Sequence, residues 1–336
     1  MANRGRRQSA RPSPPSERIS RKGPAPMTDP SANTPRIAVI IASKGRSAVL
    51  RQMLPHLNRQ SLRPALVILS VTGPEDADFD LGSLLDPGIE GRILVSAPGS
   101  CAQRNTALRA LPADIDYVVG YDDDFYPSRH ALQGLAATFA HHADVDGVTG
   151  QLIADGISGP GIPPETAEAM LADWDVDHPC DPAAAPRITR DTLGLYGCNM
   201  AFRARAAVGL EFDESLPLYG WQEDVDFAAQ LPGRRVETPA FTGVHLGTKS
   251  GREASGERLG YSQVVNPWYL WRKGNVTPGH ALQLALRNVA ANHVRALRPE
   301  PWIDRAGRVR GNWRGVAEIL TGRADPRRIL DWTAAR

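Results

Sequence analysis

Unbroken apolar runs recur along the first third of the chain and predict strands that are buried on both faces. These runs occupy residues 37–42, 65–71, 92–96 and 117–121. Runs without polar alternation are typical of parallel sheets that are covered by helices. Between the first two runs, apolar residues recur at helical spacing over residues 49–57. This strand–helix–strand order predicts an α/β fold with a doubly wound, mostly parallel central sheet flanked by helices.

An acidic cluster, Asp122, Asp123 and Asp124, directly follows the fourth run. In open α/β sheets, ligands bind beyond the carboxyl ends of the strands, which is where this cluster falls. Adjacent like charges favour a bound cation, and carboxylate oxygens on a short loop suit Mg²⁺ or Mn²⁺, especially beside substrate phosphates. The competing interpretation is a solvated acidic turn, which is the usual role of an isolated charge cluster.

Two loops that follow predicted strands carry basic residues. Residues 43–46 read Ser-Lys-Gly-Arg, and residues 98–105 open a helix that is predicted to reach about Leu111. A Gly-Ser helix start offers backbone N–H groups to a phosphate, and Arg104 adds a permanent cation. A Ser-capped helix with a surface arginine explains the second loop equally well. Neither loop has the P-loop spacing GxxxxGK[ST] or the dinucleotide fingerprint GxGxxG.

A further acidic pair, Glu223 and Asp224, stands at a predicted helix start just after Trp221. Acids in a first helical turn also stabilise the helix dipole, so the pair has an ordinary structural explanation. In the functional interpretation, the aromatic ring presents a flat face to a sugar ring, and a carboxylate removes the proton of an acceptor hydroxyl. Asp226 is expected on another face of the helix, in a structural role.

Residues 155–192 are rich in Gly, Pro, Asp and Ala and show little periodicity, apart from a helical piece at about 165–174. A stretch of this kind is typical of a lid or a binding loop. Residues 197–202 predict a strand with small residues, and Asn199 within it suits either a sugar hydroxyl or a turn cap. His245 follows the apolar-flanked segment 239–244. A lone histidine is more often structural than a ligand.

The two ends of the chain differ from its middle. Residues 1–35 are rich in Arg, Pro, Ser and Gly, so we expect a basic tail without fixed structure, with Met27 as an alternative start. Residues 36–260 are predicted to form the catalytic domain and residues 261–336 a helical extension. In the extension, residues 281–297 predict an amphipathic helix, and residues 268–273 place aromatic rings beside basic side chains. Contact with a membrane interface and packing on the catalytic domain both explain this pattern, and packing is favoured.

Composition adds few constraints. The 336 residues include 42% hydrophobic and 23% charged residues with a net charge of +2, which implies no special partner and no nucleic acid. Three cysteines without CxxC spacing argue against a disulfide framework or a structural zinc site, which favours a reducing cytoplasm. The sequence has no apolar run of about 18 residues and no apolar segment at its start, so neither a transmembrane helix nor a secretory signal is expected.

Taken together, the ordered segments resemble glycosyltransferase family 2, whose enzymes have the GT-A fold. The resemblance covers roughly residues 36–273, and each motif is weak alone but the order is specific. The segments are Ser-Lys-Gly-Arg at 43–46, Gly-Ser-Cys-Ala-Gln-Arg-Asn at 99–105, the triple Asp at 122–124, Gly-Cys-Asn-Met-Ala-Phe-Arg at 197–203 and Gly-Trp-Gln-Glu-Asp-Val-Asp-Phe at 220–227.

The resemblance implies a role for each of these positions. A divalent metal, Mn²⁺ or Mg²⁺, would be held by Asp122, Asp124 and His245, and Asp224 would be the catalytic base with Glu223 orienting the acceptor. Asp123 is expected to be structural or to lie beside the donor. The donor-binding positions implied are Ser43, Lys44, Arg46, Ser70, Arg104, Asn105, Asp122 and Asp123, with Asn199 and Trp221 for the acceptor sugar, and Lys249 and Arg252 for the diphosphate.

The hypothesis from the sequence is therefore a metal-dependent, inverting glycosyltransferase that uses a nucleotide-diphosphate sugar and a glycan or lipid-linked acceptor. Many relatives carry an acidic residue at the end of the second strand, where this chain has Ser70, with Glu75 and Asp76 further along. The identity of the donor nucleotide is therefore left open. Two alternatives stay in view: a nucleotidyltransferase that makes nucleotide sugars, and a non-catalytic protein that binds them.

Overall fold

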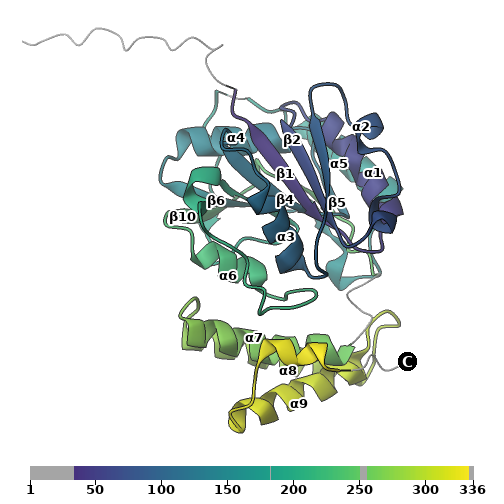
Figure 1. Cartoon of the computed structure of the whole chain (residues 1–336), viewed down its shortest axis with the longest axis vertical. Helices are drawn as coiled ribbons and strands as arrows, with labels where there is room; N and C mark the ends of the chain where they lie inside the picture. The colour runs from purple at the N-terminus through teal and green to yellow at the C-terminus, as the bar shows by residue number, and fades with distance from the viewer. Residues whose placement is uncertain (1–33, 182, 250–255, 333–336) are drawn as a thin grey trace, which may run out of the picture. The chain divides into compact units, whose positions relative to one another are not determined.

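A central sheet of eight strands runs in the order β3–β2–β1–β4–β9–β6–β10–β8 and lies between helices (Figure 1). The structure is a computed structural model that describes residues 34–181, 183–249 and 256–332. Nearly all of the predicted N-terminal tail lies outside these residues. The strands of the sheet are β1 Ile37–Ala42, β2 Leu66–Val71, β3 Glu90–Val95, β4 Tyr117–Asp122, β6 Val145–Gly150, β8 Arg190–Asp191, β9 Asn199–Arg203 and β10 Arg234–Thr238.

Alternation along β1 divides the hydrophobic core between the two faces of the sheet. Ile37, Val39 and Ile41 pack in one core with residues of α1 and α4, and Ala38 and Ile40 pack in a second core with residues of α3 and α6. Successive side chains of a strand point to opposite faces, so a strand covered on both sides must be apolar throughout. The helices are α1 Ser47–Asn58, α2 Leu81–Leu84, α3 Ser100–Arg109, α4 Ala131–His141, α5 Pro164–Asp177, α6 Glu223–Ala229, α7 Gly256–Lys273, α8 Pro278–Ala296 and α9 Arg305–Leu320.

Parallel pairing aligns the carboxyl ends of the central strands. At the end of β1, Ala42 pairs with Ser70 of β2 on one side and with Asp122 of β4 on the other. The loops that leave these strands therefore emerge at one edge of the sheet, which is the edge where α/β folds bind ligands.

A second, three-stranded sheet has the order β5–β11–β7 and joins three distant segments. Its strands are β5 Phe125–Pro127, β7 Ala154–Asp155 and β11 Gly243–His245. In its register, His245 pairs with Phe125 on one side and with Asp155 on the other. Gly243 lies so close to Phe125 and Tyr126 that a Cβ atom would stand 2.4 Å from the Tyr126 carbonyl oxygen, so this position requires glycine.

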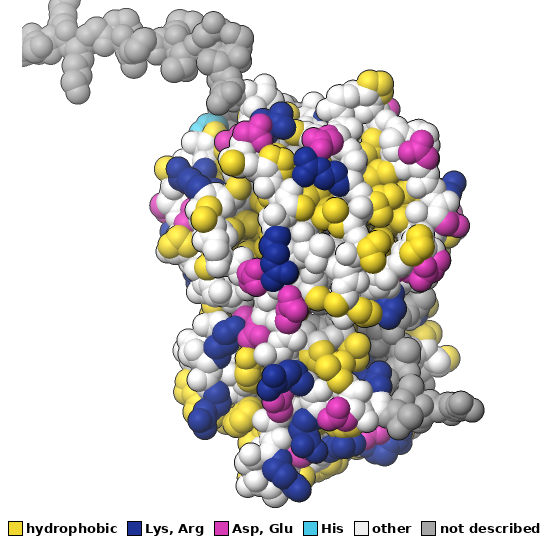
Figure 2. All heavy atoms as spheres, in the orientation of Figure 1, with side chains coloured by type: hydrophobic (Ala, Val, Ile, Leu, Met, Phe, Trp, Pro, Cys, Tyr) yellow, Lys and Arg dark blue, Asp and Glu magenta, His cyan; other side chains and the backbone are white. Residues whose placement is uncertain are grey.

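The C-terminal helices α7, α8 and α9 pack against one another, and basic side chains gather over them (Figure 2). Leu270, Val276 and Ala281 also join the core that holds α3 and α6. Near the end of α7, Lys273 Nζ donates to the carboxylates of Asp213 at 2.8 Å and Asp226 at 2.7 Å. The Asp226 carboxylate is fully buried, whereas the Lys273 side chain is 32% exposed. No helix in the described ranges has both the length and the apolar character needed to cross a membrane.

The predicted α/β fold with a mostly parallel central sheet and helices on its faces is confirmed, and the predicted strands and helices of the first third coincide with β1–β4, α1 and α3. Three features differ from the prediction or were missed. Strand β9 is antiparallel to both neighbours, because the chain enters it at the carboxyl end of β4 and must run back. The small sheet was not foreseen. Within 155–192, α5 confirms the predicted helical piece, but it buries Ala167 and Leu171 and so belongs to the packed core rather than to a loop.

Lys273→Met is expected to destabilise the protein by about 3–5 kcal/mol, because removing one partner leaves a buried carboxylate without its cation. The Asn275 side-chain amide still donates to Asp226 at 2.7 Å, so the lower end of that range is expected. Urea unfolding measures the change. The matched control is Arg272→Met at the neighbouring exposed position, which should change the free energy of unfolding by no more than about 0.5 kcal/mol. Equal losses in the two variants would contradict this account of Asp226.

Candidate active site

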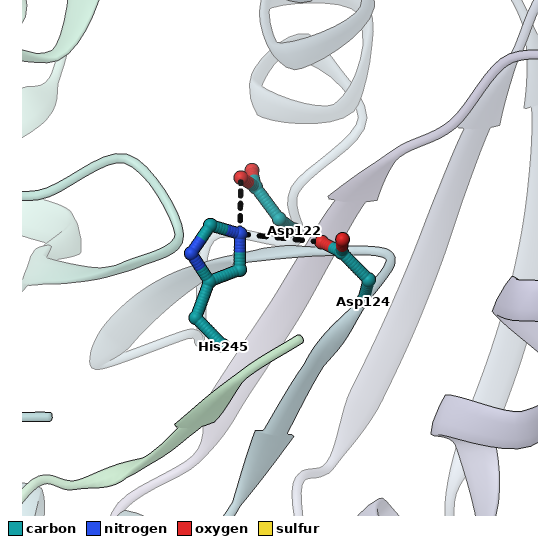
Figure 3. Close-up of side chains that lie close together, drawn as sticks. All are labelled: Asp122, Asp124 and His245. Carbon is teal, nitrogen blue, oxygen red and sulfur yellow. Dashed lines mark ion pairs between the residues drawn. The ribbon is translucent and has the colours of Figure 1, made fainter. Parts of the chain in front are cut away.

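Asp122, Asp124 and His245 converge at the edge where the two sheets meet, and their side chains point toward one another in Figure 3. The His245 Nε2 atom lies 3.4 Å from Asp124 Oδ1 and 3.9 Å from Asp122 Oδ2. Asp122 ends β4, Asp124 closes the two-residue turn before β5, and His245 ends β11. Strand β11 of the small sheet therefore places a histidine that is distant in sequence beside the acidic cluster.

A chain of hydrogen bonds orients His245. Its Nδ1 atom lies 2.9 Å from Asp155 Oδ1, and the Tyr196 hydroxyl donates to the other oxygen of Asp155 at 2.8 Å. Burial opposes protonation, but contacts with Cys198, Asp124 and Asp155 outweigh it and raise the pKa of His245 well above its usual range. A metal that bound at Nε2 would therefore displace a proton, and the Asp155 carboxylate keeps Nε2 turned toward the cluster.

These three residues fit a divalent metal such as Mn²⁺. One atom from each, two carboxylate oxygens and an imidazole nitrogen, lies within 4.8 Å of the others. Carboxylates suit Mg²⁺ and Mn²⁺, and an imidazole ligand is tolerated better by the transition metal. Burial opposes ionisation of Asp124, but His245, Arg46 and the Thr248 N–H hold the pKa of this carboxyl well below its usual range. Asp124 is thus ready to bind a cation.

Asp123 has a different role from its two neighbours. Its carboxylate is buried and accepts hydrogen bonds from Ser43 Oγ at 2.6 Å and from Arg46 Nη1 at 2.6 Å. Burial raises the pKa of Asp123, and Arg46 opposes this effect. Arg46 also donates to the Thr248 carbonyl at 2.8 Å, so it ties the first strand-to-helix loop to the segment after β11.

Arg104 joins the acidic cluster to the Glu223–Asp224 pair. Its Nη1 atom donates to Glu223, while its Nη2 atom donates to Asp122 Oδ1 at 3.2 Å and to the Gly197 carbonyl at 3.1 Å. The side chain is 5% exposed. Burial disfavours the charged guanidinium, but Glu223, Asp122 and Asp224 outweigh burial and raise the pKa of Arg104. The predicted phosphate-binding arginine is therefore engaged by carboxylates.

Asp224 begins helix α6 beside Glu223, and both oxygens of its carboxylate accept backbone hydrogen bonds. Gly197 N–H donates to Oδ2 at 2.8 Å and Val225 N–H donates to Oδ1 at 2.8 Å. Burial raises the pKa of Asp224, against these N–H groups and Arg104. Glu223 is 7% exposed and bound to Arg104, whereas Asp224 is half-buried. Of the two carboxylates, Asp224 is the more accessible to a substrate.

The loop before α6 is held from two sides. The Ser100 N–H at the start of α3 donates to the Leu218 carbonyl at 2.9 Å, and Asn266 of α7 donates to the Trp221 carbonyl at 2.7 Å. Leu218 and Gln222 have positive φ angles of 60° and 75°, a conformation that costs energy in residues other than glycine. At the N-terminus of α3, the Ser100 N–H group is therefore taken by the Leu218 carbonyl, and a phosphate contact there stays a prediction for the N–H groups that follow.

Several other predicted site residues lie in different surroundings. Asn105 is fully buried and exchanges hydrogen bonds with the backbone of Phe212, which is a structural role. Asn199 is also fully buried and contacts Thr149. Ser70 is buried at the end of β2, whereas Lys44 is exposed. Lys249 Nζ donates to the carbonyl oxygens of Gly156 and Ile157, at 3.2 and 2.8 Å, and Arg252 lies outside the described residues.

The structure adds residues that the sequence analysis did not assign to the site. Asp155 and Tyr196 support His245, as described above. Asp76 is buried after β2 and accepts hydrogen bonds from the Gly45 N–H at 2.5 Å and from the Thr72 hydroxyl at 2.6 Å. It thus places a carboxylate against the first strand-to-helix loop. The only sequence signal for Asp76 was its position six residues after Ser70. Nothing in the sequence linked Asp155 to His245.

No protein-family model matches the sequence, and no curated protein matches it. Solved structures with a similar fold include the mannosyltransferase PcManGT from Pyrobaculum calidifontis in complex with GDP-Man and Mn²⁺, which is 17% identical with a TM-score of 0.50 over 87% of this chain and 80% of that chain. They also include residues 1–349 of S. aureus TarS, 14% identical with a TM-score of 0.52 over 88% of this chain and 82% of that chain. The same TarS fragment in complex with UDP-GlcNAc is 15% identical with a TM-score of 0.50, over 86% of this chain and 84% of that chain. At these identities, the likeness shows a shared fold.

Asp155→Ala is expected to weaken Mn²⁺ binding about 10–100-fold, because loss of the carboxylate frees the His245 ring from its orientation. Titration of Mn²⁺, followed by the electron paramagnetic resonance of the free ion, measures the affinity directly. Asp177→Ala, at an exposed carboxylate on the end of α5, is the matched control and should bind Mn²⁺ as the wild type does. Unchanged Mn²⁺ affinity in Asp155→Ala would contradict a role for Asp155 in orienting His245 toward the metal.

Proposed function

We propose that this protein is a metal-dependent glycosyltransferase that moves a sugar from a nucleotide-diphosphate sugar to an acceptor hydroxyl with inversion. One observation carries the proposal: the buried Arg104 guanidinium contacts both Asp122 of the candidate metal cluster and Glu223 of the acidic pair. A site for a cation and a candidate base thus lie side by side, at the sheet edge where α/β folds bind ligands. The neighbouring structures with GDP-Man and with UDP-GlcNAc support a nucleotide-sugar donor.

In the proposed reaction, the carboxylates near Asp122 bind the metal and Asp224 acts as the base. Mn²⁺ or Mg²⁺ bound by Asp122, Asp124 and His245 would neutralise the charge of the departing diphosphate. Asp224 accepts the proton of the acceptor hydroxyl, whose oxygen forms a bond to the anomeric carbon. The bond from that carbon to the diphosphate oxygen breaks, and the electron pair leaves with the nucleoside diphosphate. A single base opposite the leaving group yields inversion.

Glu223 and Trp221 complete the acceptor side of the proposed site. Arg104 fixes Glu223, which leaves Asp224 as the carboxylate that meets the substrate. Trp221 is half-buried in the strained loop before α6, where an aromatic face suits a sugar ring. On the donor side, the buried Asp76 and the loop at residues 43–46 are our candidates for contact with the nucleoside. Lys249 remains the proposed contact for the diphosphate, with Arg252 beyond the described residues.

The motif order supports placement in glycosyltransferase family 2 with a hexosyl donor, as part of this proposal. A glycan or lipid-linked acceptor and a role in building cell-envelope polysaccharide, on the cytoplasmic side, belong to the same proposal. A nucleotidyltransferase on a related fold releases pyrophosphate from a nucleoside triphosphate, whereas the proposed reaction releases a nucleoside diphosphate. The product thus distinguishes the two activities.

A thermal-shift screen of nucleotide sugars with and without Mn²⁺ tests the proposed function. A donor that binds only the folded protein at about 100 times its dissociation constant adds about 2.7 kcal/mol of stability. We expect one class of nucleotide sugar to raise the melting temperature, and only with the metal present. Slow release of nucleoside diphosphate in the same mixture would identify a catalyst. Stabilisation without release would indicate a binding protein, and pyrophosphate release from a triphosphate would indicate the nucleotidyltransferase.

Asp224→Asn is expected to lower kcat by about 10²–10⁴-fold while donor binding and Mn²⁺ binding stay intact, because only the proton acceptor is lost. The wild-type rate should also rise with pH. Burial raises the pKa of Asp224, so the active, deprotonated form appears only as the pH passes above the ordinary value of 3.8. The pH dependence of kcat/KM shows this rise, and the Asn variant should lack it. Asp177→Asn, at an exposed carboxylate, serves as the control. A near wild-type rate in Asp224→Asn would overturn the assignment of the base.

A further inference from the structure

Helices α8 and α9 expose a set of large apolar side chains, here called the α8–α9 face. On α8, Leu282 is 61% exposed, Leu286 58% and Leu297, just past the helix end, 84%. On α9, Trp313 is 59% and Leu320 81% exposed. Single exposed apolar residues are ordinary, but a set on adjacent helices is typical of an interaction surface. The α8–α9 face comprises Leu282, Leu286, Val294, Leu297, Trp313 and Leu320.

Helical spacing places three leucines of the α8–α9 face on one side of α8. At 3.6 residues per turn, Leu282, Leu286 and Leu297 fall within an arc of about 60° along roughly 22 Å of helix. The opposite side of α8 is the side that packs on the protein, with Ala281 and Asn292 buried. Trp313 and Leu320 are two turns apart on α9, and Trp313 Nε1 donates to His293 of α8 at 2.9 Å. The two apolar stripes are therefore neighbours.

Basic residues flank the stripe on α8, and that helix contains no Asp or Glu. On the helical projection, Arg287 and Arg298 lie on one side of the leucines, about 80–100° around the helix from the nearest one. Within the described part of the chain, neither arginine side chain makes a hydrogen bond or ion pair. On α9, Arg310 is exposed, although its Nε atom lies 4.0 Å from a carboxylate oxygen of Glu257. Figure 2 shows basic side chains spread over these helices. Leucines on one side of a helix with arginines at their border are typical of helices that lie in the plane of a membrane surface.

We propose that the α8–α9 face binds the surface of an anionic lipid bilayer, with α8 lying parallel to it. The leucines would enter the boundary between headgroups and acyl chains, where tryptophan is also favoured. The arginines would contact anionic headgroups, each contributing about fivefold to the partition coefficient. A second copy of the chain fits this face less well, because pairing two acid-free helices brings like charges together. The phosphates of a nucleic acid could pair with the arginines, but its backbone has no apolar surface for the leucines.

Co-sedimentation of the full-length protein with vesicles tests the proposal without any assay of activity. We expect binding to vesicles that contain phosphatidylglycerol in phosphatidylcholine, weaker binding at high salt, and little binding to pure phosphatidylcholine. The double variant Leu282→Asp/Leu286→Asp should lose at least about tenfold in affinity, because charged groups replace both anchors. The matched control is Val176→Asp/Val208→Asp, which changes valines that are 80% and 81% exposed outside the C-terminal helices, and it should bind as the wild type does.

Two further measurements keep the proposal open to refutation. Circular dichroism checks that the leucine variant is folded; if it is not, Arg287→Glu/Arg298→Glu decides, and it should lose binding to the anionic vesicles. Light scattering in solution tests for a second copy: a dimer that Leu282→Asp/Leu286→Asp dissociates would overturn the proposal in favour of self-association. Absence of binding to anionic vesicles, or full binding by the folded leucine variant, would also overturn it. None of these measurements depends on sugar transfer, so they test membrane binding independently of the proposed function.

Discussion

The buried guanidinium of Arg104 is the contact on which the candidate site depends. Asp122 and the adjacent pair Glu223 and Asp224 come from two distant segments of the chain, and their negative charges would repel one another without a shared cation. Arg104 of α3 supplies that cation and also donates to the Gly197 carbonyl, just before strand β9. Burial of a charge is costly unless it is paired and hydrogen-bonded, and Arg104 makes three hydrogen bonds, two of them to carboxylates. Its position thus fixes the spacing between the cation site and the candidate base.

The second constraint is the register of the small sheet. Strand β11 lies between β5 and β7, so His245 stands directly beside Phe125 and Asp155. A shift by one residue would turn the His245 side chain to the other face of the sheet, away from Asp122 and Asp124. Gly243 permits this register, because a side chain at that position would collide with the Tyr126 carbonyl. The geometry of the metal cluster is therefore set by backbone pairing rather than by the side chains alone.

The sequence predicted much of the main sheet and pointed to the acidic cluster of the candidate metal site, because both depend on local pattern. The strand at residues 37–42 and the cluster at 122–124 can be recognised without knowing what lies opposite them. The supporting contacts could not be predicted in this way. Asp155 meets His245 only through a two-residue strand, which is too short to leave a periodic signal. Arg104 was expected to face a phosphate, since its helix start resembles an anion site, and the carboxylates that hold it are distant in sequence.

Helix α7 links the candidate site to the C-terminal helices. Asn266 holds the Trp221 carbonyl in the strained loop, and Lys273 holds the buried Asp226 one turn after Glu223. The helix that carries the candidate base is thus anchored to α7 at two points, the Trp221 carbonyl just before its start and the Asp226 side chain at its middle. Since α7 also packs against α8 and α9, the loop before α6 and the α8–α9 face belong to one packed unit. A lipid surface that oriented α8 would therefore also orient Trp221 and Asp224, which would give a lipid-linked acceptor a defined direction of approach.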